Sequence, residues 1–332
     1  MMSIRESIVV FTLLLSLSVF LIVANSSMDP YKALNIILNP DGTLTRVKIP
    51  PQNPPSSDPN LPVLSKDIPI NRSKHTWSRI FLPHTQLHHK LPLIVFYHGG
   101  GFILYSASST YFHDFCINLA NSTKSIIVSV EYRLAPEHRL PAAYDDSVEA
   151  LQWIKDSKDS WLTNHADYSR TYLMGESAGG NIAYNVALRA AAEIDQIKPL
   201  KIKGLILIQP FFGGKKRTGS ELRLAEDGTL PLPVTDLMWN LSLPVGADRD
   251  HEYSNEAVNG ERCKVLGQGW RVGVFGCDGD PLVDRQIQLL NLLKANHVNV
   301  TGQFYPGGRH GIFIGDPSMS AQVFHFLNNL LS

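Results

Sequence analysis

Short runs of apolar, often β-branched residues alternate along this chain with stretches in which apolar residues recur at helical spacing. A strand that is apolar throughout must be buried on both faces, which is typical of parallel sheets whose strands are joined by helices. The alternation therefore predicts an α/β fold with a mostly parallel sheet covered by helices on both faces. The predicted strands are residues 93–97, 126–130, 172–174, 205–208, 272–275 and 300–305, and the predicted helices are 109–120, 143–154, 181–192 and 282–295.

Two segments do not follow this alternation. Residues 28–66 are rich in proline, asparagine and serine, with a helical pattern over residues 31–38. Residues 215–262 contain glycine, proline and acidic residues around an apolar segment, 236–243. Because glycine and proline interrupt regular structure, we interpret the second segment as a lid inserted into the sheet domain.

The composition argues against several classes of protein. The 332 residues include 30 basic and 30 acidic side chains, so no basic excess indicates a nucleic-acid partner. The three cysteines, Cys116, Cys263 and Cys277, cannot form a disulfide framework, and none lies in a Cys-x-x-Cys pair. The sequence shows no cluster with metal-ligand spacing, so we expect no bound metal.

The N-terminal extension, residues 1–27, is treated separately from the fold. Residues 8–24 are almost wholly apolar and would span roughly 25 Å as a helix, close to the short limit for a hydrocarbon core of ~30 Å. The extension fits a secretory signal peptide, a short membrane anchor, or a leader that is absent when translation starts at Met28. A start at Met28 predicts a cytoplasmic protein, and the other two predict a secretory or membrane-anchored one whose only membrane contact is through residues 1–27.

A Gly-x-Ser-x-Gly pattern surrounds Ser177. The pentapeptide Gly175-Glu176-Ser177-Ala178-Gly179 lies between a predicted strand and a predicted helix, which is the context that a nucleophilic serine requires. Such a turn strains the serine backbone and presents its hydroxyl near a helix N-terminus, where the helix dipole favours developing negative charge. We therefore predict that Ser177 is a catalytic nucleophile.

Three consecutive glycines, Gly99, Gly100 and Gly101, follow a predicted strand and His98. Attack on an ester carbonyl creates an oxyanion that needs fixed N–H donors, and only backbone without Cβ atoms approaches a substrate closely enough. We predict that the N–H groups of Gly100, Gly101 and Ala178 form an oxyanion hole. The alternative is a glycine-rich turn, whereas a phosphate loop would need a following Lys-Ser/Thr, which is missing.

The partners of such a serine follow it in the order acid, then histidine. His310 is the histidine after Ser177 that follows a predicted strand and a Gly-Gly turn, from which a loop side chain reaches back to the serine. The acid is expected just past the preceding strand, where Asp278, Asp280 and Asp284 lie. Asp280 also fits a helix N-cap and Asp284 a first helical turn, so these residues alone leave the acid unresolved, with Asp278 as the rival of Asp280.

Four motifs, taken together and in this order, resemble a known family. They are HGGGF (98–102), YRLAPE (132–137), GESAGG (175–180) and DPL (280–282) followed by His310-Gly311. Over residues 28–332 the chain resembles the hormone-sensitive-lipase-like branch of the α/β hydrolases, and more narrowly the plant carboxylesterases of that branch. The segments MDPY (28–31) and NPDGTLTR (39–46) are similar to their usual start.

The resemblance implies an α/β-hydrolase fold with an eight-stranded sheet, and a cap built from about residues 28–65 and 215–262. It implies Ser177, Asp280 and His310 as the triad, since the acid of this branch usually lies in the Asp-Pro-Leu motif. The implied activity is a cofactor-free serine carboxylesterase acting on small or medium acyl esters of plant metabolites. Glu176 departs from the family, in which aspartate is commoner at that position.

Two other functions stay open at this point. Relatives in this branch include dehydratases and cyclases of plant metabolism that use the same residues, and hormone receptors that lack the triad histidine. His310 argues against a receptor, and nothing in the motifs separates an esterase from a dehydratase. For the substrate pocket we propose Met238 and Trp239 of the lid, although both residue types also commonly fill buried gaps between packed elements.

Overall fold

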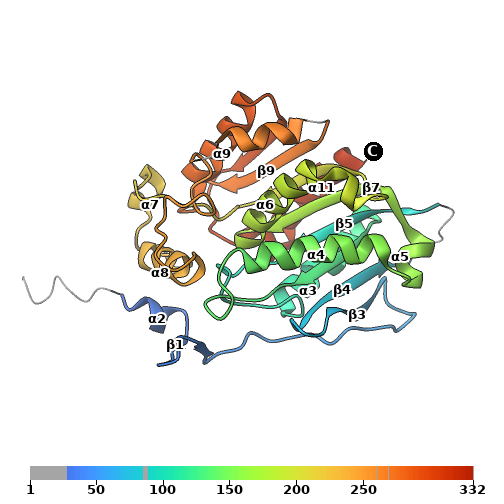
Figure 1. Ribbon diagram of the computed structural model, residues 1–332, viewed down its shortest axis with the longest axis horizontal. Coiled ribbons are helices and arrows are strands. Elements are labelled where there is room, and N and C mark those ends of the chain that lie inside the picture. Colours follow the sequence, from blue (N-terminus) through green and yellow to red (C-terminus); the bar gives the residue numbers. More distant parts are fainter. Residues whose placement is uncertain (1–27, 85–88, 259, 268, 332) are drawn as a thin grey trace, which may run out of the picture.

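The computed structural model describes residues 28–84, 89–258, 260–267 and 269–331 (Figure 1). Eight strands form one sheet in the order β10-β9-β8-β7-β5-β6-β4-β3, parallel except that β4 runs antiparallel to both of its neighbours. The predicted eight-stranded, mostly parallel sheet is confirmed. The strands are β3 (Val63–Asn71), β4 (Thr76–Pro83), β5 (Leu91–Tyr97), β6 (Ile126–Glu131), β7 (Ala166–Glu176), β8 (Ile202–Ile208), β9 (Arg271–Cys277) and β10 (Asn299–Tyr305).

Strands β3 and β4 were not predicted, because charged residues interrupt their apolar pattern. Arg79 of β4 is 1% exposed and donates two hydrogen bonds to the carboxylate of Asp67 in β3, at 2.6 and 2.7 Å. The partner of this buried charge lies on the neighbouring strand β3, so the pair cannot be recognised from the periodicity of β4 alone. Residues 63–65, which were expected in the cap, belong to β3.

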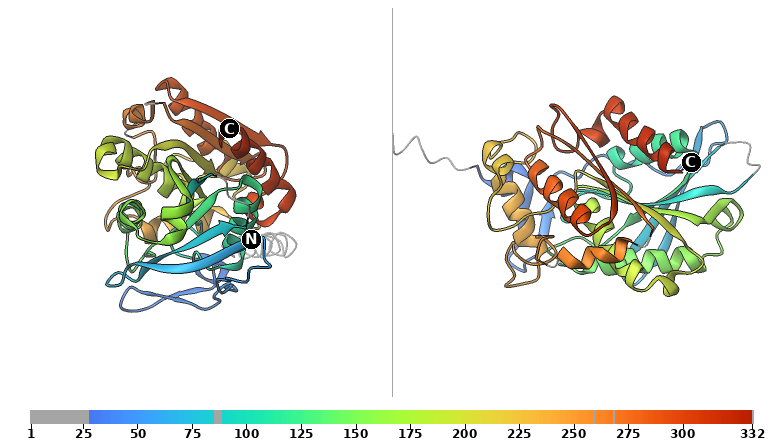
Figure 2. Two further views of the ribbon diagram at one scale, coloured as in Figure 1. Left: turned by 90° about the vertical axis from the view of Figure 1, so that its right-hand side faces the viewer. Right: turned by 90° about the horizontal axis from the view of Figure 1, so that it is seen from above.

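Helices cover both faces of the sheet (Figure 2). Each face has its own apolar cluster. Leu93, Val95 and Tyr97 of β5 point to one face, whereas Ile94 and Phe96 point to the other, as the period of two in a strand requires. The first face packs against α4 (Ala142–Asp156), α6 (Ala178–Ala192) and α9 (Val283–Ala295), and the second against α3 (Thr110–Thr123) and α11 (Pro317–Leu331).

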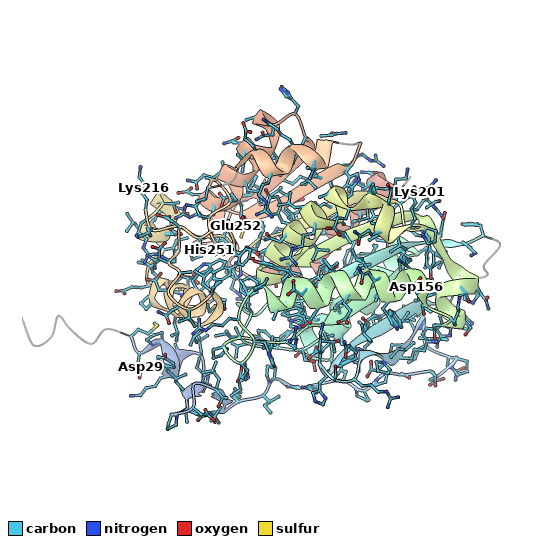
Figure 3. All side chains as sticks on the ribbon, in the orientation of Figure 1. Asp29, Asp156, Lys201, Lys216, His251 and Glu252 are labelled. Atoms are coloured by element: carbon cyan, nitrogen blue, oxygen red, sulfur yellow. The ribbon has the colours of Figure 1, made fainter. Side chains whose placement is uncertain are left out.

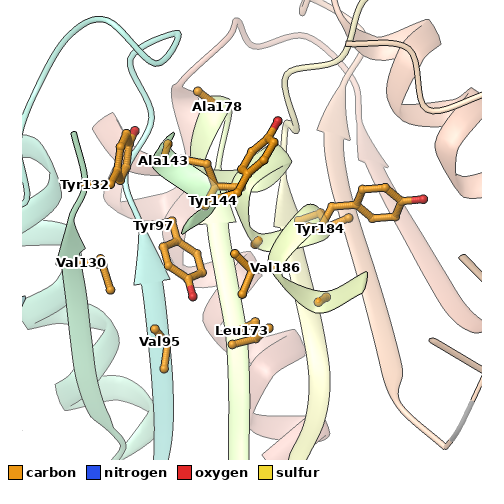
Figure 4. Close-up of a cluster of buried hydrophobic side chains, with 14 of the residues drawn as sticks. Val95, Tyr97, Val130, Tyr132, Ala143, Tyr144, Leu173, Ala178, Tyr184 and Val186 are labelled. Carbon is orange, nitrogen blue, oxygen red and sulfur yellow. The ribbon is translucent and has the colours of Figure 1, made fainter. Parts of the chain in front are cut away.

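Figure 4 shows part of the first cluster, in which Val95, Leu173 and Val186 pack between the strands and α6. Short elements complete the chain: α5 (Ser160–His165), α10 (Ile312–Gly315), and the 3₁₀ helices Ile194–Ile197 and Gly260–Gly267. Within the described part of the chain, no helix is long and apolar enough to cross a membrane. The apolar stretch 8–24 lies outside the described residues.

The two irregular segments gather at one end of the sheet (Figure 1). The first contains α2 (Pro30–Ala33) and a hairpin of β1 (Ile36–Leu38) and β2 (Leu44–Arg46), and the second contains α7 (Gly219–Arg223) and α8 (Leu232–Ser242), which packs against α2. Asp29 and Lys216 mark this end in Figure 3, and Asp156 and Lys201 mark the opposite end.

The helix expected over residues 31–38 is only partly correct. Helix α2 ends at Ala33, and residues 36–38 form strand β1. Asn35 between them has φ 52°, a left-handed conformation that stops a helix and that asparagine tolerates better than most residues. The apolar residues of this segment therefore belong to two different elements.

A buried ion pair ties the segment 215–262 to the sheet domain. Glu221 of α7 and Arg285 of α9 are 4% and 5% exposed, and the guanidinium donates to both carboxylate oxygens at 3.0 and 3.2 Å. Nearby, Ser220 Oγ donates to the carbonyl of Pro281 at 2.8 Å. The lid is thus attached beside the loop that contains Asp280.

The Glu221→Ala variant is expected to lower the free energy of unfolding by about 3–5 kcal/mol, because Arg285 would stay buried without its partner. Chemical denaturation measures the loss. In the control, Glu221→Leu with Arg285→Met should recover most of the stability. A double variant that is as unstable as Glu221→Ala would contradict the pairing.

Candidate active site

Ser177 occupies a strained turn between β7 and α6. Its φ of 54° and ψ of −121° lie in a region that non-glycine residues rarely adopt. The turn requires glycine on both sides, because a Cβ on Gly175 would overlap the carbonyl oxygen of Gly179, and a Cβ on Gly179 would overlap that of Tyr97. The serine is held at the N-terminus of α6, with only 6% of its surface exposed.

The structure brings the three predicted triad residues together. His310 Nε2 lies 2.8 Å from Ser177 Oγ, and His310 Nδ1 lies 3.0 Å from Asp280 Oδ2. All three side chains are buried, with Asp280 completely excluded from solvent. They come from the loops after β7, β9 and β10, whose carboxyl ends meet at the same edge of the sheet.

Asp280 is held in place by other side chains. Its Oδ2 accepts hydrogen bonds from Gln209 Nε2 and Gln286 Nε2, each at 2.8 Å, and its Oδ1 accepts one from the N–H of Leu282 at 2.9 Å. These donors stabilise the carboxylate and fix the oxygen that faces His310. The rival candidate Asp278 is exposed, and its carboxylate accepts instead from the N–H of Gly307.

Sequence reasoning missed both glutamines. Gln209 follows β8 with φ 41°, an unusual backbone conformation, and its Oε1 also accepts from the N–H of Gly311 at 2.9 Å. Gln286 lies in the first turn of α9, six residues after Asp280. The role of Gln209 depends on contacts with two distant loops, and that of Gln286 on how the chain turns between Asp280 and α9. The sequence carries no local pattern for either.

The glycine loop after β5 lies beside Ser177. Gly100 and Gly101 have φ of 109° and 60°, and both line the same cavity as Ser177. A Cβ on Gly100 would overlap the carbonyl of Leu104, and one on Gly101 would overlap the side chain of Met238. Ala178 is the first residue of α6, where backbone N–H groups have no partner within the helix. Gly100 and Gly101 thus lie beside Ser177, and Ala178 directly follows it, which are the positions that the predicted oxyanion hole requires.

His98 contacts the glycine loop rather than the reacting groups. Its Nδ1 lies 2.8 Å from the carbonyl of Gly99, and its ring stacks on Tyr132 at 4.3 Å. The Tyr132 hydroxyl donates to the carbonyl of His98 at 2.7 Å. Burial lowers the pKa of His98 to about 4, so the ring is neutral near pH 7.

A second carboxylate, Glu176, flanks His310. Its Oε1 lies 3.9 Å from His310 Nε2, on the opposite side of the ring from Asp280. Burial raises the pKa of Glu176 to about 7, partly offset by the attraction of His310. Burial lowers the pKa of His310, because it disfavours the charged ring. The charge and hydrogen bond of Asp280 raise this pKa, and so does the charge of Glu176. Together these effects outweigh burial, so the pKa of His310 lies above its ordinary value.

The cavity beside these residues has a volume of about 290 Å³. Met238, one of the two predicted pocket residues, lines it, whereas the structure does not bring Trp239 to its lining. Trp239 is 1% exposed and stacks on Phe211 at 4.6 Å, so its large apolar ring fills the core behind the cavity wall. The apolar part of the lining is Leu34, Leu104, Phe112, Leu230, Met238 and Ile314.

Cys116, Cys263 and Cys277 are buried and unbridged. Within the described ranges, the side chains of histidine, cysteine, aspartate and glutamate form no group that could hold a metal ion.

Comparison with known proteins identifies the class of this fold and site. Residues 94–314 match a family described as having the alpha/beta hydrolase fold, and an esterase from Pyrobaculum calidifontis superimposes with a TM-score of 0.69 at 26% identity, covering 84% of each chain. The chain is 49% identical to Carboxylesterase 20 of Arabidopsis thaliana, over 91% of this chain and 96% of the relative. It is 44% identical to a 3-O-acetylpapaveroxine carboxylesterase of Papaver somniferum, over 91% and 98%.

The class is thus that of the α/β hydrolases. Within it, the chain belongs to the plant carboxylesterases of the hormone-sensitive-lipase-like branch, the family predicted from its four motifs.

The Glu176→Gln variant is expected to lower the pKa of His310, because the negative charge of Glu176 favours the imidazolium. Titration of labelled histidines by NMR measures the shift, with His310→Asn to assign the signal. As a control, Glu226→Gln removes one negative charge from an exposed position and should leave the His310 titration unchanged. An equal or higher His310 pKa in Glu176→Gln would contradict the interaction.

Proposed function

We propose that this protein is a serine carboxylesterase that hydrolyses small-molecule esters, with Ser177 as the nucleophile, His310 as the general base and Asp280 as the acid of the triad. The observation that carries the proposal is the continuous pair of hydrogen bonds from Asp280 through His310 to Ser177, at 3.0 and 2.8 Å. Ser177, at the end of this series of hydrogen bonds, lines a cavity whose wall includes the glycine loop. The carboxylesterase relatives support the same reaction.

The mechanism follows from these positions. His310 Nε2 removes the proton of Ser177 as Oγ attacks the carbonyl carbon, and Asp280 stabilises the imidazolium that forms. The N–H groups of Gly100, Gly101 and Ala178 stabilise the oxyanion. The imidazolium then protonates the leaving alcohol, and an acyl-serine remains. A water molecule, deprotonated by His310, attacks the acyl carbon, and the acid leaves as Ser177 regains its proton.

We also propose that the segments at residues 28–62 and 215–262 act as a cap that limits the size of the substrate. Leu34 of the first segment and Thr229, Leu230 and Met238 of the second line the cavity. A cavity of about 290 Å³ lies at the small end of the usual range of ligand pockets, which favours small or medium acyl groups.

Hydrolysis of p-nitrophenyl acetate, butyrate and octanoate by the purified protein tests the activity. The Ser177→Ala variant is expected to lose at least ~10³-fold in kcat/KM. Because triad residues act as a unit, Ser177→Ala with His310→Ala should be no worse than Ser177→Ala alone.

A double variant that is far less active than the single one would contradict the role of His310. Acid and alcohol released in equal amounts from a plant ester would support hydrolysis. Loss of the acyl group with a new double bond or ring in the remaining product would instead indicate a dehydratase or cyclase.

Variants of Met238 and Trp239 distinguish a residue that lines the pocket from one that packs in the core behind it. Met238→Ala enlarges the cavity and is expected to raise kcat/KM for octanoate relative to acetate by about tenfold. Trp239→Ala is expected to lower stability by about 3–5 kcal/mol and to reduce activity on all esters alike, because the ring packs in the core. Thermal denaturation and the ratio of the two rates distinguish the outcomes. A larger change of chain-length preference in Trp239→Ala than in Met238→Ala would contradict this assignment.

A further inference from the structure

Glu176 presents a buried carboxylate to the substrate cavity without a hydrogen-bond donor of its own. The residue is 4% exposed and lines the cavity together with Ser177 and His310. Among the residues that the structure describes, no donor is hydrogen-bonded to this carboxylate. Its carboxylate lies 3.9 Å from His310 Nε2, and that nitrogen is already hydrogen-bonded to Ser177 Oγ.

Two other carboxylates, one buried and one half-buried, do accept hydrogen bonds. Asp280 accepts from two glutamine side chains and a backbone N–H. Glu131 accepts from the hydroxyl of Ser106 at 2.9 Å and from the N–H of Ala107 at 2.6 Å. A buried carboxylate without such donors is energetically unfavourable, and a ligand that supplies a partner relieves that cost on binding. Because Glu176 has no such donor within the described protein, we infer that its partner is a group of the substrate.

The position of Glu176 makes a positive partner more favourable than a neutral one. Its Oε2 lies against Gly99, at the start of the glycine loop, where a Cβ would overlap it. An ionised carboxylate so close to the oxyanion hole opposes the negative charge that develops on the substrate oxygen. A cation bound between the carboxylate of Glu176 and the substrate oxygen would remove this repulsion and would stabilise the charged form of Glu176.

Aromatic rings complete the surroundings of a cation site. Tyr105, Tyr111 and Phe112 line the same cavity, with the ring of Tyr105 edge-on to the other two at 6.5 and 5.6 Å. Burial raises the pKa of Tyr105, and the negative charge of Glu176 raises it further. The phenol is therefore neutral, and it is close enough to Glu176 to interact with that carboxylate. Aromatic faces with a nearby carboxylate are the environment that holds ammonium groups in proteins. Arg309 also lines the cavity, but it is exposed and its charge is screened by solvent.

We propose that Glu176 is a specificity-determining residue that binds an ammonium group of the ester substrate. This inference rests on the proposed esterase activity and names the substrate class within it: esters that carry a protonated or quaternary amine near the scissile bond. Glu176 would contact the substrate cation, while Ser177 and His310 carry out the same chemistry on neutral esters.

The test compares esters that differ only in charge. The first pair is acetylcholine and 3,3-dimethylbutyl acetate, with the charge in the alcohol. The second is the ethyl esters of 4-(trimethylammonio)butanoate and 5,5-dimethylhexanoate, with the charge in the acyl group. The ratio of kcat/KM within a pair cancels any effect of a substitution on His310. We expect the wild type to favour the cationic ester of at least one pair by about ten- to thirtyfold.

The Glu176→Gln variant should abolish that preference and leave activity on the neutral ester measurable. The matched control, Glu226→Gln, removes an exposed charge from the lid and should keep the wild-type ratio. Calorimetric binding of both esters to Ser177→Ala gives the same comparison without turnover. Equal ratios in the wild type and Glu176→Gln would overturn the inference, as would a preference that persists in Glu176→Gln. Failure to hydrolyse p-nitrophenyl acetate would instead overturn the proposed function.

Discussion

The close approach of two backbone segments at the Ser177 turn is the constraint on which the site depends. The carbonyl of Tyr97, at the end of β5, touches Gly179 so closely that any side chain there would collide with it. Helix α6 can therefore begin directly above the sheet only if the turn is as tight as the one that gives Ser177 its φ of 54°. The same contact brings the end of β5, and with it the glycine loop, beside the serine hydroxyl. One packing requirement thus places both Ser177 and the glycine loop that is proposed to bind the oxyanion.

The other two triad residues are placed by the order of the strands. Strands β8, β9 and β10 follow β7 across the sheet in chain order and run parallel to it, so the loops after them lie next to one another. Gln209, from the loop after β8, bridges the two other loops through Asp280 and Gly311. The lid contacts the same group of loops, because Ser220 Oγ donates a hydrogen bond to the carbonyl of Pro281, next to Asp280. A shift of the lid would therefore act on the loop of the triad acid.

The parts of the structure that sequence predicted are those with a local pattern. The central strands, four of the five covering helices, and the positions of Ser177 and His310 follow from apolar periodicity and from glycines in fixed places. Asp280 was separable from Asp278 only by family resemblance, since both follow the same strand, and the structure separates them by burial. Strand β4 was not predicted because the partner of Arg79 lies on another strand. Gln209 and Gln286 were missed because both bond to Asp280, whose position depends on the folding of its loop. Trp239 and Met238 are adjacent in a lid helix, yet only the direction of each side chain decides which one reaches the cavity.

The electrostatics of the site follow from having two carboxylates around one imidazole. Asp280 accepts hydrogen bonds from two glutamine side chains and a backbone N–H, and these donors hold its carboxylate beside His310. Glu176 has a similar depth of burial but no donors, so its charge depends on what enters the cavity. A carboxylate with donors, such as Asp280, supports catalysis on any ester. A carboxylate without donors, such as Glu176, makes the rate sensitive to the charge of the substrate. Because Glu176 directly precedes Ser177, the strained turn that places the serine beside the cavity also fixes the residue that selects the substrate.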